Sequence, residues 1–216
     1  MSDNNKPILW YFADPMCSWC WGFSPVIEQV RVQFADQLKI ALNLGGLRPG
    51  TTHTITQNER DEILHYWHAV QQMTGAEFKF ENAMPEGFIY DTEPASRLVT
   101  LVAAIDPELV FKCFHNIQAA FYRDGEDVTS KTTLKKIAGN LGVSENQFND
   151  LFDSANIKQN TQQHFEGTYQ AAIRGFPAIV WQDINNTEKL CSGYVPFEKL
   201  SNQIENKLKN SAKQRV

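Results

Sequence analysis

The sequence predicts an α/β fold in which a single sheet is interrupted by a large helical insertion. Three observations predict it: a strand–helix–strand pattern near the N-terminus, a long central stretch without strand signals, and a helix–strand–strand–helix pattern at the end. The chain has 216 residues, of which 42% are hydrophobic and 21% are charged, an ordinary composition for a globular protein. We therefore expect residues 1–50 and 157–216 to form one domain around the sheet, and residues 51–156 to form a helical insertion domain.

The first part of the chain has the pattern of a buried strand, a helix and a second strand. Residues 8–13 are aromatic and aliphatic on both faces, which favours a central strand covered from both sides. Apolar residues then recur at helical spacing from Cys17 to Phe34, and Pro25 should kink this helix because its ring removes a backbone donor. Residues 39–44 form the second strand candidate, which Gly45 and Gly46 end.

The central and final parts of the chain complete the predicted order of elements. Helices are expected over residues 59–73, from 91 or 92 to 105, from 106 through a stripe that reaches Phe121, over 130–141, over 144–152 and over 157–173. Ser130 and Ser144 are candidate helix caps. Short strands are expected over 178–182 and 189–193, followed by a closing amphipathic helix over 196–208.

Charge and hydropathy exclude several function classes and predict the compartment. The net charge of −5 and a pI near 5.5 argue against a nucleic-acid-binding protein, which usually carries a basic face. No apolar run approaches the length of about 18 residues that spans a membrane, and the N-terminus lacks the pattern of an export signal. We therefore expect a cytoplasmic protein, in which a close cysteine pair is more often catalytic or metal-binding than structural.

Cys17 and Cys20 form a C-x-x-C motif at the start of the first helix. Backbone N–H groups and the helix dipole stabilise a thiolate at such a position, and a motif of this kind can lower the pKa of its first cysteine. We therefore expect Cys17 to be the nucleophile and Cys20 the more buried resolving thiol, with Ser18 and Trp19 tuning the thiolate.

Other interpretations of the cysteines stay open from the sequence alone. A C-x-x-C pair can be half of a zinc site, although such a site normally needs a second ligand pair. An inert pair of buried cysteines is also common. Cys113 and Cys191 stand singly and are expected to be buried structural residues. Pro177, which follows Gly175-Phe176, is either a simple helix breaker before a strand or a cis-proline facing the cysteines.

The order of these features resembles the DsbA-like branch of the thioredoxin superfamily, and most of all its cytoplasmic FrnE-like group of predicted disulfide isomerases. The stretches that carry the resemblance are 14–22 (DPMCSWCWG), 85–94 (PEGFIYDTEP) and 175–178 (GFPA). It implies a thioredoxin-like fold (β-α-β, then α-β-β-α) with an inserted all-helical domain. It also implies that Cys17 attacks, that Cys20 resolves, that Pro177 is the cis-proline and that Phe176 lies beside the substrate.

Two departures from the family pattern concern the groups that would help move protons. Many relatives carry an acidic residue in the first strand, whereas residues 8–13 have none and Asp14 is the nearest acid. The inner pair of the motif is Ser18-Trp19 rather than the Pro-His of the periplasmic oxidase. Asp14 is therefore a candidate proton acceptor, and a strongly oxidising potential is not expected.

The function predicted from these residues is that of a thiol–disulfide oxidoreductase, a disulfide reductase or isomerase acting through a mixed disulfide. Its partners would be protein or peptide thiols and disulfides, with no cofactor and with glutathione as a possible co-substrate. Tyr90, together with Met84 and Phe88, is a candidate for an apolar wall beside the cysteines, although core packing explains these residues equally well. The alternatives are a glutathione-dependent transferase or isomerase of the kappa class, and a zinc- or peptide-binding module.

Overall fold

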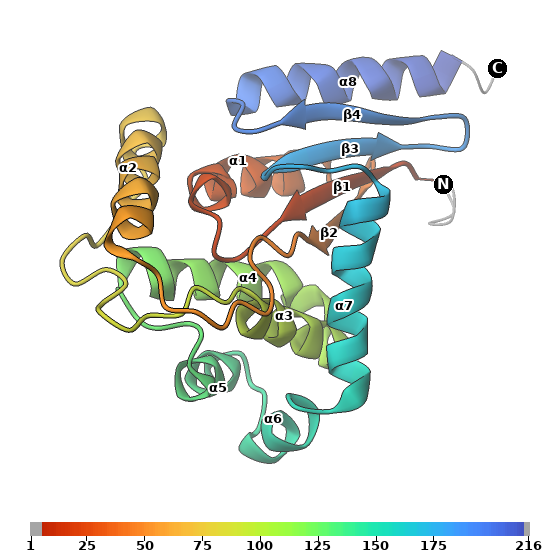
Figure 1. Ribbon diagram of the computed structural model, residues 1–216. Helices are drawn as coiled ribbons and strands as arrows, with labels where there is room; N and C mark the ends of the chain where they lie inside the picture. The colour runs from red at the N-terminus through yellow and green to blue at the C-terminus, as the bar shows by residue number, and fades with distance from the viewer. Residues whose placement is uncertain (1–5, 214–216) are drawn as a thin grey trace.

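The computed structural model describes residues 6–213 and contains a four-stranded sheet in the order β2-β1-β3-β4 (Figure 1). The strands are β1 (Ile8–Ala13), β2 (Lys39–Leu44), β3 (Ala178–Gln182) and β4 (Thr187–Ser192). β1 pairs in parallel with β2 and antiparallel with β3, so it is central in the sheet, as its apolar pattern predicts.

Helices cover both faces of the sheet. α1 (Ser18–Phe34) and α8 (Phe197–Lys213) pack on one face, and α7 (Ala155–Gln170) crosses the opposite face against β2 (Figure 1). Because β1 leads directly into the start of α1, the C-x-x-C motif lies at the end of the central strand. Among residues 6–213, no helix is both long and apolar enough to cross a membrane.

The insertion between β2 and α7 is helical, as predicted. Its helices are α2 (Gln57–Thr74), α3 (Glu93–Ile105), α4 (Val110–Gln118), α5 (Lys131–Asn140) and α6 (Glu145–Leu151), and residues 75–92 form an irregular segment. A capping box starts α2, because the Thr56 hydroxyl accepts from the Glu59 amide and the Glu59 carboxylate accepts from the Thr56 amide.

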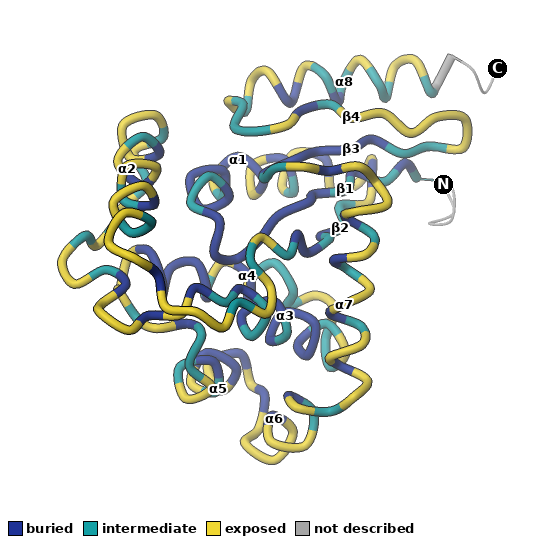
Figure 2. Tube along the Cα trace, in the orientation of Figure 1, coloured by how far each residue is buried: buried dark blue, intermediate teal, exposed yellow. Residues whose placement is uncertain are grey.

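The sheet and the helical insertion share one apolar core. Leu9 and Trp181 of the sheet belong to the same buried cluster as Leu98 of α3 and Ile117 of α4. Figure 2 shows buried residues both in the sheet and on α3 and α4. The division into two domains stays a prediction, but the packing joins the two parts closely.

Several element boundaries differ from the prediction for physical reasons. The helix expected from residue 106 is instead a 3₁₀ turn (Pro107–Leu109), then α4, then a π-helical turn (Ala119–Arg123). α7 ends at Gln170 rather than at 173, because Ala172 is left-handed and the Ile173 amide bonds back to the Thr168 carbonyl. The side chain of Ser130 makes no cap hydrogen bond, whereas Ser144 forms a capping box with Gln147.

Candidate active site

Cys17 lies at the N-cap of α1, between the end of β1 and the first turn of the helix. Its side chain and backbone together are only 7% exposed, and its thiol donates a hydrogen bond to the carbonyl oxygen of Phe176 across 3.7 Å. The amides of Cys20 and Trp21 donate to the Cys17 carbonyl, which closes the first turn below the sulfur. A thiolate formed on Cys17 would therefore lie at the positive end of the helix dipole.

Cys20 is fully buried one turn further into α1. Burial raises the pKa of the Cys20 thiol well above its ordinary value, and the adjacent Cys17 side chain raises it further. Cys20 therefore stays a neutral thiol at neutral pH while Cys17 is reduced. The sulfur of Cys17 is the one of the two that borders the surface groove described below.

Asp14 joins the end of β1 to the loop that follows β2. Its carboxylate is fully buried, accepting from the Met16 amide at 2.9 Å and from the Leu47 amide at 2.8 Å. Burial raises the pKa of this carboxyl to about 6, and the two amide hydrogen bonds offset only part of that effect. Both carboxylate oxygens hold the backbone around the motif, and the role of Asp14 as proton acceptor stays a prediction.

In place of an acid, β1 brings a phenol towards the cysteines. Tyr11 is fully buried in the middle of β1, and its hydroxyl oxygen has no hydrogen-bond partner. Burial, followed by the neighbouring Cys20 and Cys17, raises the pKa of Tyr11 well above its ordinary value. The phenol is therefore uncharged throughout the physiological pH range.

The segment before β3 faces the motif from the other side. The Phe176–Pro177 peptide bond is cis, and the carbonyl of Phe176 is the one that accepts from Cys17. The ring of Phe176 packs against Gly45, where a Cβ atom would come within 2.3 Å of it. The residue directly after β2 must therefore lack a side chain for Phe176 to take this position.

A groove of about 230 Å³ opens over the Cys17 sulfur. Its walls come from the motif, the loop after β2, the helix α2 and the segment before β3, and include Ser18, Trp19, Leu47, Arg48, Tyr66, Tyr90 and Phe176. Ser18 and Trp19 are half-buried at its rim, and the hydroxyl of Tyr90 donates to the Met16 carbonyl at 2.6 Å. The structure thus brings the predicted residues Phe176 and Tyr90 to the motif.

The remaining sequence candidates lie away from the groove. Met84 and Phe88 do not line it and are buried at 3% and 7% exposure, so core packing is their role. Cys113 and Cys191 are buried, as predicted, and burial raises the pKa of Cys191 to about 11. Among residues 6–213 there is no cluster of three or more His, Cys, Asp or Glu side chains that could hold a metal ion.

This geometry can be compared with that of known proteins. The family model of the DSBA-like thioredoxin domain matches residues 8–205, nearly the whole chain. The chain belongs to the DsbA-like thioredoxin family. Its fold is accordingly the DsbA-like thioredoxin fold, with the central strand and α1 carrying the motif and with helices inserted after β2.

Solved structures of DsbA-like proteins superpose closely on this chain. A proposed protein disulfide isomerase from Nitrosomonas europaea is 46% identical with a TM-score of 0.90, over 95% of this chain and 99% of that one. The cytosolic disulfide reductase DsbM from Pseudomonas aeruginosa is 23% identical with a TM-score of 0.72, over 85% of this chain and 89% of that one.

Curated relatives of the DsbA-like chain are more distant. The ClpXP adapter protein SpxH from Halalkalibacterium halodurans is 19% identical over 206 residues, which cover 89% of this chain. The chain spans 65% of the length of that relative and 64% of the length of the corresponding protein from Shouchella clausii.

Sequence reasoning missed the contribution that α2 and the loop after β2 make to the groove of this DsbA-like protein. Leu47 and Tyr66 border the groove and are 40% and 47% exposed, which is high for large apolar side chains. In the sequence, Tyr66 is one aromatic residue on an amphipathic helix and Leu47 one residue after two glycines. Neither carries a signal that the fold will place it next to Cys17.

Proposed function

We propose that this protein is a thiol–disulfide oxidoreductase that reduces or isomerises disulfides of proteins and peptides through a dithiol made of Cys17 and Cys20. The observation that carries the proposal is the pairing of a near-surface Cys17 thiol at a helix start with a fully buried Cys20 thiol one turn behind it. Family membership supports the reaction class, and the burial of Cys20 supports the assignment of roles.

In the first step the Cys17 thiolate attacks one sulfur of a substrate disulfide. A new S–S bond forms between Cys17 and the substrate, the substrate S–S bond breaks, and the departing thiolate takes a proton from solvent. The backbone amides at the start of α1 stabilise the attacking thiolate. The groove beside Cys17 leaves room for the substrate cysteine between the motif and Phe176.

In the second step Cys20 loses its proton and attacks the Cys17 sulfur. The mixed disulfide breaks, a Cys17–Cys20 disulfide forms and the second substrate thiol leaves, so that two electrons and two protons have passed to the substrate. The high pKa of Cys20 slows its attack on the mixed disulfide. Another thiol of the substrate then has time to attack the mixed disulfide instead, which releases Cys17 and leaves the substrate with a rearranged disulfide. A slow resolving thiol is the property that isomerisation requires.

The groove favours extended, partly apolar substrates. Leu47, Tyr66 and Trp19 offer apolar surface, while Arg48 and Glu62 add one charge of each sign. These features fit an unfolded protein or a short peptide whose cysteine is flanked by apolar residues.

A thiol of low molecular weight must reduce the Cys17–Cys20 disulfide again, and we propose glutathione for this step. One of the solved neighbours, the cytosolic reductase DsbM, has a structure with glutathione at 24% identity to this chain. The same relative supports a cytoplasmic site of action, where glutathione is abundant. The competing kappa-class reaction would also use glutathione, but it would not need Cys20.

The experiment is a turnover assay with a peptide disulfide and glutathione as reductant. The proposal predicts that Cys17→Ser abolishes turnover, that Cys20→Ser lowers it strongly, and that Cys113→Ala and Cys191→Ala keep it. Full activity of Cys17→Ser would show the proposal to be wrong. Conjugation of an aromatic substrate with glutathione that survives Cys20→Ser would instead favour the transferase.

The direction of the reaction is measured separately, from the reduction potential of the Cys17–Cys20 couple in glutathione buffers. A reductase that is restored by glutathione requires a potential near the cytosolic glutathione poise of about −220 to −260 mV, because glutathione cannot reduce a disulfide whose potential lies well below that value. An isomerase requires a potential well above the poise, so that the couple stays in the dithiol form.

A further inference from the structure

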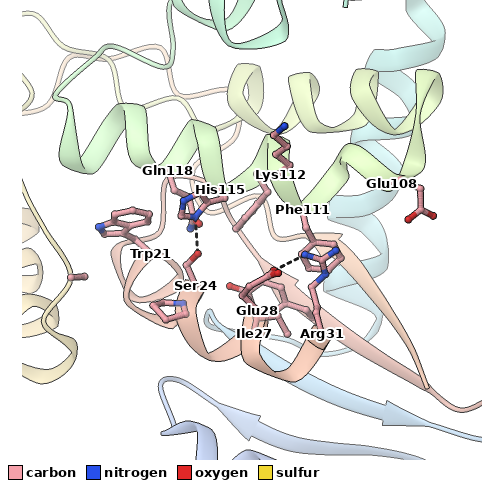
Figure 3. Close-up of a pocket in the computed structure, with 14 residues that line it drawn as sticks. Trp21, Ser24, Ile27, Glu28, Arg31, Glu108, Phe111, Lys112, His115 and Gln118 are labelled. Carbon is pink, nitrogen blue, oxygen red and sulfur yellow. Dashed lines mark hydrogen bonds and ion pairs between the residues drawn. The ribbon is translucent and has the colours of Figure 1, made fainter. Parts of the chain in front are cut away.

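A second and larger cavity, of about 550 Å³, lies between α1 and α4 (Figure 3). Its walls are mainly apolar and include Trp21, Ile27, Phe111 and Phe114. It shares no lining residue with the groove over Cys17. Its volume falls in the range of pockets that bind small molecules, about 300–1,000 Å³.

Two buried polar groups on the wall of this cavity lack hydrogen-bond partners. Gln118, at the end of α4, is fully buried, and neither the oxygen nor the nitrogen of its side-chain amide is bonded. Tyr11, from β1, brings an equally buried hydroxyl that makes no hydrogen bond of ordinary geometry, although the Cys20 side chain lies next to it. Leaving such groups unpaired costs free energy, so an unpaired set beside a cavity points to a missing partner.

The backbone is irregular at the same place. The π-helical turn Ala119–Arg123 begins directly after Gln118, and turns of this kind are frequent at functional sites. Figure 3 shows His115 and Gln118 on the side of α4 that faces α1. The His115 ring is bonded to the Ser24 hydroxyl at 2.9 Å, so the amide of Gln118 differs from its neighbour in having no partner.

The charges around the cavity balance. Arg31 is paired with Glu28 at 2.6 Å, and its guanidinium lies over the ring of Phe111 at 4.2 Å. Glu108 and Lys112 add one exposed charge of each sign. Partial burial, followed by the nearby Arg123, lowers the pKa of His115, which favours the uncharged ring. Nothing in this lining offers a net countercharge to a ligand.

We propose that the cavity between α1 and α4 binds a neutral, flat aromatic molecule with an amide-type edge, which pairs with the Gln118 side chain. The amide of Gln118 offers one donor and one acceptor side by side, which match the oxygen and N–H of a second amide. The aromatic part of the ligand would lie between the apolar side chains of α1 and α4. The site is separate from the dithiol groove and does not depend on disulfide chemistry.

The test uses 2-naphthamide as probe and 2-naphthoate as its matched control, with binding to the full-length protein followed by calorimetry. The two molecules have the same shape, but the carboxylate is charged and cannot donate a hydrogen bond. We expect saturable binding of 2-naphthamide with one site per chain, and binding of 2-naphthoate at least tenfold weaker. No binding of the amide, or equal binding of both molecules, would overturn the proposal.

Two variants locate the site. Gln118→Leu replaces an unpaired buried amide by an apolar side chain of similar size, so folding should be preserved, and 2-naphthamide should bind about tenfold more weakly. Tyr11→Phe gives a second measurement if Gln118→Leu does not fold, and should weaken binding by a few-fold. Unchanged affinity in the folded variants would contradict the proposal.

The outcome is distinguishable from that of the proposed redox function. Cys17→Ser should bind 2-naphthamide as the unsubstituted protein does, because Cys17 lines the other groove. Glutathione should not displace the probe. If Cys17→Ser lost binding, or if glutathione competed with the probe, the ligand would occupy the dithiol groove and the inference would be wrong.

Discussion

The ring of Phe176 lies so close to Gly45 that a Cβ atom at position 45 would approach it to 2.3 Å. Because the Phe176 carbonyl accepts the hydrogen bond of the Cys17 thiol, this contact helps to fix the wall of the dithiol groove. A side chain at residue 45 would have to push the aromatic ring away. Gly45, directly after β2, thus influences the active site although it contributes no reactive group.

Gly45→Ala should therefore disturb both stability and disulfide exchange. Overpacking of this kind costs about 1–3 kcal/mol, and displacement of Phe176 should lower the rate of peptide disulfide reduction. Urea unfolding and the turnover assay measure the two effects. Gly139→Ala is the matched control, because nothing lies within 4 Å of a Cβ there, and it should stabilise α5 by about 0.5–1 kcal/mol. Equal behaviour of the two variants would count against the contact.

Tyr90→Phe should loosen the backbone that carries Cys17. The Tyr90 hydroxyl donates to the Met16 carbonyl at 2.6 Å in a buried position, and its removal leaves that carbonyl unsatisfied. The expected loss is about 1–3 kcal/mol of unfolding free energy, together with slower exchange. Tyr66→Phe is the control from the opposite wall, since its hydroxyl bonds only to the exposed Glu62. It should change stability by less than about 0.5 kcal/mol.

Thr56→Ala should destabilise α2, the helix that supplies Tyr66 to the groove. Thr56 and Glu59 form a complete capping box, and the loss of an N-cap side chain costs about 1 kcal/mol. Ser130→Ala is the control, because the Ser130 side chain makes no cap bond at the start of α5. Unfolding free energies should separate the two variants, and a loss as large in Ser130→Ala would contradict the assignment of the caps.

The buried carboxyl of Asp14 should make stability depend on pH. The pKa of Asp14 is about 6 in the folded protein against an ordinary value of 3.8, so the folded state holds this proton longer than the unfolded chain. Its contribution to stability is complete below pH 4 and is lost as pH rises through 6. By linkage the loss amounts to roughly 3 kcal/mol.

Urea unfolding of the reduced protein between pH 4 and pH 7 measures this effect. The unfolding free energy of the unsubstituted protein should fall relative to that of Asp14→Asn as the pH rises. Burial works against ionisation of Asp183, but hydrogen bonds from Trp181 and the Asn185 amide lower its pKa to about 2, outside this interval. Asp183→Asn should therefore run parallel to the unsubstituted protein. If the unfolding free energies of Asp14→Asn and of the unsubstituted protein changed in parallel with pH, Asp14 would not be a buried carboxyl with a raised pKa.

The sequence predicted the sheet better than it predicted the groove. The strands 8–13 and 39–44 have the predicted bounds, because a run of apolar residues between turn signals reflects local chemistry. The end of α7 was misplaced because Ala172 adopts a left-handed conformation that alanine does not signal. The helix from residue 106 changes its hydrogen-bond pattern twice, and an apolar stripe does not predict such changes.

The reactive pair was found because its spacing and its place after a strand are local features. The partners of Cys17 come from far along the chain: Phe176 by way of its carbonyl, and Leu47, Tyr66 and Tyr90 by way of the groove. The resemblance to a family implied Phe176, and Tyr90 was predicted as part of an apolar wall, but Leu47 and Tyr66 were not predicted. The unbonded amide of Gln118 could not be foreseen at all, because only packing decides whether a buried polar group finds a partner.

The central claim is tested most directly by trapping the mixed disulfide in Cys20→Ser. This variant is incubated with a disulfide-containing unfolded protein, and the products are mapped by mass spectrometry after proteolysis without reductant. We predict a covalent adduct through Cys17, which is absent from a variant that also carries Cys17→Ser. No adduct, or one that maps to Cys113 or Cys191, would contradict a dithiol mechanism led by Cys17.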